Sequence, residues 1–228
     1  MKKVLVMVLS ANVQDFGFHV QSIRDTWGTQ TSDDFSVLYY YGKRRWRPRP
    51  PRGGVRQIGD TLICDAKEVY ETISLRTMMA FRYVHHQRVE GTLDFDYIFR
   101  CCCVSYVVPD ELLRFVQDKP SERFYCGIQG QSQETPFASG SGYFLSRDLL
   151  KEVVENRQAI LDLPMADDVA LGHFMNSIGV QIDSRARRVD FSCTPVQGEY
   201  HYHLSHDMPM MHELHDALNS ALAADSKS

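Results

Sequence analysis

Residues 95–106 read FDYIFRCCCVSY, an apolar run followed by one arginine, three consecutive cysteines, valine, serine and tyrosine. A short apolar run rich in aromatic residues predicts a buried β-strand over residues 95–100. Four other segments have the same character: KVLVMVLSA (3–11), FSVLYYYG (35–42), ERFYCGIQ (122–129) and GSGYFLS (140–146). The sequence therefore predicts a sheet that contains all five segments.

Helical patterns separate these strands. The longest, AKEVYETISLRTMMAFRYVHHQ (66–87), has apolar residues largely at helical spacing. Shorter helices are expected at residues 20–28, 109–117, 146–161 and 166–180, with Ser146 as an N-cap. Strands separated by helices predict an α/β fold with a mostly parallel central sheet, covered by helices on both faces.

In such sheets, ligands bind at the carboxyl ends of the strands, so the segment after Arg100 is expected to face a ligand. Cys101, Cys102 and Cys103 cannot all bind one metal ion from a strand end, because successive side chains point to opposite faces. Buried small hydrophobic residues are the favoured interpretation. A structural metal site or a reactive thiol are the alternatives, although no histidine lies nearby in the sequence to lower a thiol pKa.

The bulk composition narrows the class of protein. The chain has 228 residues, of which 43% are hydrophobic, and a net charge of -4, which argues against a dedicated nucleic-acid-binding protein. The N-terminal apolar run is too short for a transmembrane segment and lacks a signal cleavage site, so we expect a first strand there. Adjacent cysteines rarely pair with each other, which favours a reduced, cytoplasmic compartment.

Two segments have a biased composition. KRRWRPRPPRGGVR (43–56) combines seven cationic residues with prolines and two glycines, which excludes a helix interior or a central strand. We expect an exposed basic loop, either a solvated surface or an arm that contacts an anionic ligand or partner. Residues 205–228 are expected to form a C-terminal tail or helix.

Histidines gather in GEYHYHLSHDMPMMHELHD (198–216). His201 and His203 would share one face of a strand, whereas His212 and His215 have helical spacing, so two or three histidines could converge on a metal ion. The spacing of a zinc hydrolase is absent, which makes that function the weakest candidate. A functional histidine among His201, His203 and His206, or histidines that only pack or lie on the surface, both remain open.

Asp167 and Asp168 open the predicted helix at 166–180. The pair fits an ordinary N-terminal cap, because carboxylates are stabilised by the helix dipole and by free amides. It also fits a general base, with one ionised acid and a neighbour that sets its environment. The segment ASGSGYFLS (138–146) has small residues that let the backbone approach a ligand or a strand closely, and it matches no phosphate-binding or dinucleotide motif.

Taken in order, these segments resemble the beta-galactosyltransferase and fringe type of glycosyltransferase. SIRDTWG (22–28) resembles the family's Ile-Arg-x-Thr-Trp-Gly, and EVYETISLRT (68–77) its Asp-x-Tyr-x-Asn-Leu-Thr-x-Lys-Thr. FASGSGYFLSRDLL (137–150) resembles Tyr-x-x-Gly-x-Gly-Tyr-x-x-Ser, and ADDVALG (166–172) resembles Glu-Asp-Val-x-x-Gly. The matches run in register from about residue 3 to residue 172. They imply a GT-A fold, formed as a single domain over residues 1–228.

The family's metal-binding motif is missing from this sequence. The family holds its nucleotide-sugar donor with a divalent cation on an Asp-x-Asp motif, which would fall at residues 102–104, where the sequence reads CCV. The pattern DFD at 94–96 lies before the strand and therefore at the wrong end of the sheet. The resemblance implies no certain cofactor; if Mn²⁺ or Mg²⁺ is used, His201 or His203 would be expected to bind it.

The resemblance also assigns expected roles. Without a metal ion, protein cations and donors must stabilise the departing diphosphate. The candidates for the donor site are Arg24, Arg76, Arg100, Ser105, His201 and His203. Asp168 matches the catalytic base and Asp167 a residue that orients it or binds the acceptor. Gly140, Ser141 and Gly142 would line the acceptor side.

These roles describe an inverting glycosyltransferase that moves a hexose from a nucleoside-diphosphate sugar, with a UDP-sugar expected, to a hydroxyl group of a glycan or glycoconjugate. The missing aspartates motivate an alternative, a non-catalytic relative that binds a nucleotide sugar or a glycan. A third class is an interaction protein whose basic segment binds acidic partners.

Overall fold

A computed structural model of the chain describes residues 1–10, 14–43, 51–132, 135–205 and 209–225. Seven strands form the main sheet in the order β3-β4-β2-β1-β5-β8-β7, and a second sheet has the order β6-β10-β9. The strands of the main sheet are β1 (Val4–Leu9), β2 (Phe35–Lys43), β3 (Val55–Ile58), β4 (Thr61–Lys67), β5 (Tyr97–Cys102), β7 (Tyr125–Ser132) and β8 (Thr135–Ser146). Those of the second sheet are β6 (Ser105–Val107), β9 (Val189–Asp190) and β10 (His201–His203).

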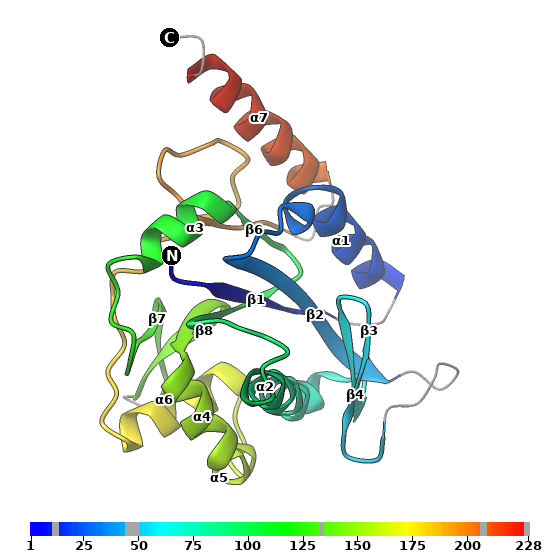
Figure 1. Cartoon of the computed structure of the whole chain (residues 1–228), viewed down its shortest axis with the longest axis vertical. Helices are drawn as coiled ribbons and strands as arrows, with labels where there is room; N and C mark the ends of the chain where they lie inside the picture. Colours follow the sequence, from blue (N-terminus) through cyan, green and yellow to red (C-terminus); the bar gives the residue numbers. More distant parts are fainter. Residues whose placement is uncertain (11–13, 44–50, 133–134, 206–208, 226–228) are drawn as a thin grey trace.

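Helices pack on both faces of the main sheet, as Figure 1 shows. The α-helices are α1 (Gln14–Asp25), α2 (Ile73–Val89), α3 (Pro109–Val116), α4 (Arg147–Glu155), α5 (Arg157–Leu161), α6 (Asp167–Ser177) and α7 (Pro209–Asp225); two 3-10 helices span Trp27–Thr29 and Tyr70–Thr72. Residues of α1, α3 and α7 belong to one core, and residues of α2, α4, α5 and α6 to the other. The predicted covering of both faces is confirmed.

The continuous apolar run of β1 explains its central position. Val4, Val6 and Val8 are buried in the first core, whereas Leu5 and Met7 are buried in the second. Side chains alternate between the faces of a strand, so only a strand covered on both sides can bury every residue of such a run. β1 accordingly pairs in parallel with β2 on one side and with β5 on the other.

The sheet is parallel at its centre and antiparallel at its margins. β4, β2, β1 and β5 run in parallel, whereas β3 pairs antiparallel with β4, and β8 with β5 and β7. Because β8 runs in the opposite direction, its middle lies beside the carboxyl end of β5, where Cys101 pairs with Gly142. This edge also receives the start of α6, so it is the place where the predicted site residues can meet.

The structure corrects two expectations about elements. The helix predicted over residues 66–87 begins at Ile73, because Ala66 and Lys67 end strand β4 and a 3-10 turn follows. Strands β3 and β4 form a hairpin closed at Gly59, whose φ of 58° suits a glycine. Within the predicted basic loop, residues 44–50 lie outside the described residues, and Val55 and Arg56 belong to β3.

Two smaller points complete the fold. Ser146 occupies the N-cap position of α4, but its hydroxyl donates to Asp148 Oδ1 at 2.5 Å instead of accepting from a free helix amide. In the described part of the chain, every helix is too short or too polar to span a bilayer.

Candidate functional site

A cavity of about 840 Å³ opens at the carboxyl edge of the sheet between α2 and α6. Its lining residues are Leu9, Tyr70, Glu71, Ile73, Ser74, Leu75, Arg100, Leu161, Leu163, Pro164, Met165, Ala166, Asp167 and Asp168. The volume falls within the range of about 300–1,000 Å³ that small-molecule sites occupy. Both predicted carboxylates, Asp167 and Asp168, therefore line a cavity large enough for a small-molecule ligand.

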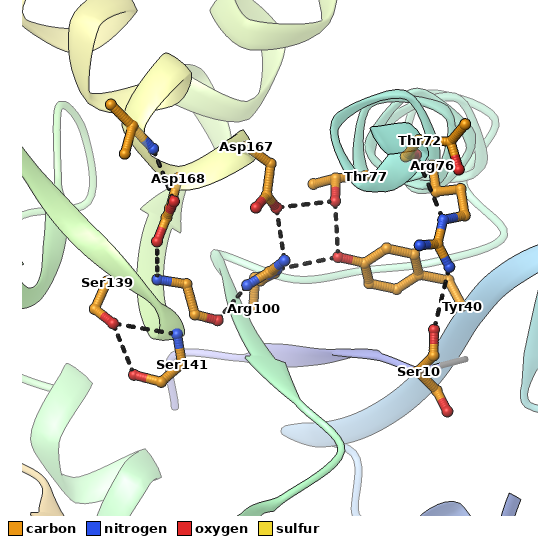
Figure 2. A network of polar contacts seen from close by, with 12 residues as sticks. Ser10, Tyr40, Thr72, Arg76, Thr77, Arg100, Ser139, Ser141, Asp167 and Asp168 are labelled. Carbon is orange, nitrogen blue, oxygen red and sulfur yellow. Dashed lines mark hydrogen bonds and ion pairs between the residues drawn. The ribbon is translucent and has the colours of Figure 1, made fainter. Parts of the chain in front are cut away.

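Asp168 stands in the first turn of α6 and is only half-buried (Figure 2). Its Oδ2 accepts a hydrogen bond from the Gly140 amide at 2.7 Å, and its Oδ1 accepts one from the Val169 amide at 2.9 Å. These two backbone amides fix the orientation of the carboxyl group. The side chain is thus held in one orientation and lines the cavity.

Asp167 has a different environment from its neighbour. Arg100 Nη2 donates to Asp167 Oδ2 at 2.6 Å, and the side chains of this pair are only 3% and 10% exposed. Thr77 Oγ1 donates to the same oxygen at 3.2 Å. Burial alone would lower the pKa of Arg100, but Asp167 raises that pKa well above its ordinary value. Asp167 therefore neutralises Arg100, which leaves Asp168 as the carboxylate open to a substrate.

The other N–H groups of Arg100 also bond within the protein. Nε donates to the Tyr40 hydroxyl at 3.1 Å, and Nη1 donates to the Gly140 carbonyl, as Figure 2 shows. The guanidinium thereby fixes β5 to β2, β8 and α6. Arg100 does line the cavity, but its predicted contact with a donor diphosphate stays a prediction.

The remaining predicted arginines lie apart from this group. Arg76 pairs with Glu68 and donates to the Ser10 carbonyl at 3.4 Å, so it ties α2 to the end of β1. Arg24 pairs with Asp60 at 2.6 Å, directly before the first residue of β4 and thus at the amino end of that strand. The structure does not bring Arg24 to the cavity.

Packing within the protein explains why positions 140 and 142 are glycines. A Cβ on Gly140 would lie 2.7 Å from Arg100 Nη1 and 3.0 Å from Asp168 Oδ2. A Cβ on Gly142 would lie 2.4 Å from the His201 ring. Each glycine therefore makes room for a side chain of the site, in addition to any space for an acceptor sugar.

A second polar group lies beside this edge, where β6 meets β10. The Ser105 hydroxyl donates to the Ser141 carbonyl at 3.1 Å and lies 3.1 Å from His201 Nε2. His201 is 2% exposed, and burial with the nearby charge of Arg188 holds its pKa well below the ordinary value. It is therefore a neutral imidazole at physiological pH. His203, more exposed, lies 3.6 Å from Asp190 Oδ1.

The three adjacent cysteines have different environments. Cys101 and Cys103 are buried, and burial raises the pKa of both thiols. Burial would also raise the pKa of Cys102, but hydrogen bonding and charge from His203 lower it. The Cys102 sulfur lies 3.6 Å from the Ser105 hydroxyl. Two cysteines thus act as small core residues, and the third joins the Ser105 group.

The position of the missing metal motif does not suit Mg²⁺ or Mn²⁺. Cys102, Cys103 and Val104 offer sulfur and aliphatic groups, whereas these hard cations prefer oxygen ligands. In the described residues, no three histidine, cysteine, aspartate or glutamate side chains are arranged to hold a metal ion. Asp94 and Asp96 contact Lys3 at the amino end of β1. His215 contacts the Tyr106 hydroxyl at 2.8 Å, and His206 lies outside the described residues.

Sequence reasoning did not name two residues at this edge as site residues. Tyr70, whose side chain is 74% exposed, lines the cavity from the 3-10 turn before α2. Arg188 donates from Nη1 to the Ser141 hydroxyl. The motif EVYETISLRT contains Tyr70, and the basic run SRARR (184–188) contains Arg188, but neither pattern specifies a position in the fold.

No protein-family profile matches the chain. It is 25% identical over 192 residues to UDP-GalNAc:beta-1,3-N-acetylgalactosaminyltransferase 1 of Sus scrofa, covering 71% of this chain and 56% of that protein. It is 24% identical over 208 residues to the protein of the same name in Homo sapiens, covering 78% and 61%. The chain thus spans less than two thirds of the length of these curated relatives.

Two solved structures share the fold. One is a glycosyltransferase involved in the glycosylation of the major capsid of PBCV-1, with a TM-score of 0.56, 9% identity, and coverage of 92% of this chain and 98% of that chain. The other is the apo-form glycosyltransferase GlyE of Streptococcus pneumoniae TIGR4, with a TM-score of 0.53, 9% identity, and coverage of 99% and 64%. The GT-A-like fold is confirmed, and the chain is similar to glycosyltransferases in sequence and in fold.

Proposed function

We propose that this chain is an inverting glycosyltransferase that moves a hexose from a nucleoside-diphosphate sugar to a hydroxyl group of a glycan. The observation that carries the proposal is Asp168, an oriented carboxylate at the start of α6 that faces a ligand-sized cavity. The sequence similarity to transferases named for UDP-GalNAc supports a UDP-sugar as donor.

The geometry supports a single displacement. Asp168 takes the proton of the acceptor hydroxyl as its oxygen attacks the anomeric carbon. The bond from that carbon to the diphosphate breaks on the opposite face, and the nucleoside diphosphate leaves with the electron pair. Attack opposite the leaving group inverts the configuration. Asp167 positions this machinery through Arg100, because the same guanidinium also holds the Gly140 carbonyl.

Tyr70 gives the cavity a surface for the acceptor. Its exposed ring provides an apolar face beside the carboxylates, and a sugar ring has an apolar face of carbon-bound hydrogens that can pack on it. The acceptor hydroxyl would then point toward Asp168. Gly140, Ser141 and Gly142 follow one another along β8, and the Gly140 amide donates to Asp168.

The central experiment compares Asp168→Asn with wild type in a transfer assay over a panel of nucleotide sugars and glycan acceptors. Loss of the base should lower kcat by about 10²–10⁴-fold, while the protein stays folded with only a small drop in stability and donor binding remains unchanged. Asp162→Asn, an exposed carboxylate five residues before the pair, is the matched control and should keep full activity. Wild-type transfer by Asp168→Asn would reject the proposal.

Metal use has its own test. Because residues 102–104 do not suit Mn²⁺ or Mg²⁺, we expect transfer to continue in excess EDTA. Complete loss of transfer that Mn²⁺ restores would contradict the cation-free part of the proposal and leave the assignment of Asp168 intact.

A non-catalytic relative that binds a nucleotide sugar or a glycan is the second candidate. It is favoured by the absence of carboxylates at residues 102–104 and by the internal bonding of Arg100. Donor hydrolysis or transfer above background by the wild-type chain would exclude it.

A further inference from the structure

Arg188 lies next to the Ser105 group, directly before strand β9. Its Nη1 donates to the Ser141 hydroxyl, and the Ser141 carbonyl accepts the hydrogen bond of Ser105 at 3.1 Å. Ser105 in turn lies 3.6 Å from the sulfur of Cys102, the residue at which the carboxylate motif is missing. The guanidinium is therefore linked, through two serines, to the carboxyl end of β5.

In the described residues, Arg188 keeps one N–H group on Nη1 and one on Nη2 that bond to no protein atom, whereas its Nε is buried against Asp190. A guanidinium has five N–H groups. In the described structure, Nη1 bonds to Ser141 and Nη2 to Asp190 Oδ2 at 3.0 Å, while Nε lies 2.7 Å from Asp190 Oδ1 without hydrogen-bond geometry. The side chain is 14% exposed. Arg100 also bonds through all three of its nitrogens, but its side chain is only 3% exposed.

Arg188 and Asp168 contact adjacent residues of β8. Asp168 accepts from the Gly140 amide, and Arg188 donates to the hydroxyl of Ser141, the next residue. Consecutive Cα atoms are about 3.8 Å apart, so the anion and the cation flank the same short piece of strand.

We propose that Arg188 binds the diphosphate of the donor and stabilises the charge that develops on it, at the place where the sequence lacks metal-binding carboxylates. This inference rests on the proposed function. When the bond from the anomeric carbon to the diphosphate oxygen breaks, the electron pair stays on that oxygen, and the fixed guanidinium charge offsets it. A planar guanidinium suits this task, because it binds two phosphate oxygens at once.

Before a donor binds, the guanidinium of Arg188 is paired with Asp190. Its carboxylate pairs with the guanidinium and is 42% exposed, so the diphosphate competes with it for the same donors. His203 lies 3.6 Å from the same carboxylate. The Asp190 carboxylate thus occupies guanidinium donors that a diphosphate would use. Replacing this carboxylate should favour diphosphate binding.

The test measures the binding of UDP, UMP and uridine by calorimetry, in EDTA, to wild type and variants. Arg188→Ala should weaken UDP binding by at least about tenfold and leave uridine binding unchanged, because only the phosphates contact the guanidinium. Arg188→Lys should recover part of the loss, since it keeps the charge but not the fork. Arg187→Ala, which removes a half-exposed neighbour paired with Glu199, is the matched control. Asp190→Asn should keep or strengthen UDP binding.

Different outcomes separate this inference from the proposed function. Equal loss of UDP and uridine in Arg188→Ala, or a loss of UDP binding in Asp190→Asn as large as in Arg188→Ala, would make the ion pair structural and overturn the inference. Unchanged UDP binding in Arg188→Ala, with transfer still abolished by Asp168→Asn, would overturn the inference alone. Absence of UDP binding and of transfer in wild type would instead reject the proposed function.

Discussion

At the scale of single residues, Asp167 and Asp168 show how neighbours acquire separate tasks. A helix turns by about 100° per residue, so adjacent side chains at its start face different surroundings. Asp167 turns inward to Arg100, whereas Asp168 reaches the cavity and the Gly140 amide. The first is part of the internal framework of the site, and the second is available for chemistry.

This difference predicts that the two substitutions destabilise the protein to very different extents. Asp167→Asn leaves the buried Arg100 charge without its partner, so the free energy of unfolding should fall by about 3–5 kcal/mol. Asp168→Asn keeps an acceptor for the Gly140 amide and should lower the free energy of unfolding by less than about 1 kcal/mol. Urea denaturation of both variants measures the contrast. The double variant Arg100→Met with Asp167→Leu should recover part of the loss, and equal destabilisation by the two single substitutions would contradict the assignment.

At the scale of elements, strand β8 brings the separate parts of the site together. It contacts β5, α6 and the Ser105 group through residues 138–143. Two of these are glycines at which a Cβ would overlap a site side chain. The strand can therefore lie this close to its neighbours only with small residues.

Gly142→Ala should consequently be destabilising. The new Cβ would lie 2.4 Å from the His201 ring, and overpacking of a filled site costs about 1–3 kcal/mol. Gly17→Ala in α1 is the control, because nothing lies within 4 Å of its Cβ position and alanine favours a helix by about 0.8–1 kcal/mol over glycine. Thermal unfolding should thus shift in opposite directions. A neutral Gly142→Ala would show that His201 can move away.

The elements that the sequence predicts well are those with one dominant signal. The apolar runs of β1, β2 and β5 and the Pro109 start of α3 coincide with the observed elements. The β3–β4 hairpin could not be read in this way, because β3 has only four residues, and Ala66 suits a strand end as well as a helix. Periodicity does not locate the point at which a strand gives way to a helix.

The position of a site residue can be predicted from the sequence where its contacts are local, within its own helix or backbone. Asp168 at a helix start is such a case. The partners of Arg24 and Arg100 are set by tertiary pairing over 36 and 67 positions, and no local pattern specifies them. Arg188 was missed for the same reason, since its contact with Ser141 spans 47 positions.

At the scale of the whole molecule, buried His201 couples protonation to stability. Burial and nearby positive charge hold the pKa of the folded His201 well below 6.5, the ordinary value that applies in the unfolded chain. As the pH falls below that value, the unfolded chain binds a proton that the folded protein excludes, so stability is lost. The maximal slope is about 1.4 kcal/mol per pH unit.

Urea denaturation of wild type between about pH 8 and about pH 5.5 should therefore show a steeper loss of stability than His201→Asn, which removes the titrating ring. Groups that titrate in both proteins contribute equally to the two curves, so the difference reports His201. Parallel curves would show that His201 gains its proton as readily in the folded state as in the unfolded chain.

The order of the strands in the main sheet also constrains when the site can form. β1, β2 and β5 are adjacent in space and are complete by residue 102, whereas the contacts of Gly140, Asp168, Arg188 and His201 come from the second half of the chain. The edge of the sheet that carries the cavity therefore gains Asp168, Arg188 and their contacts on β8 only after the second half of the chain has been synthesised.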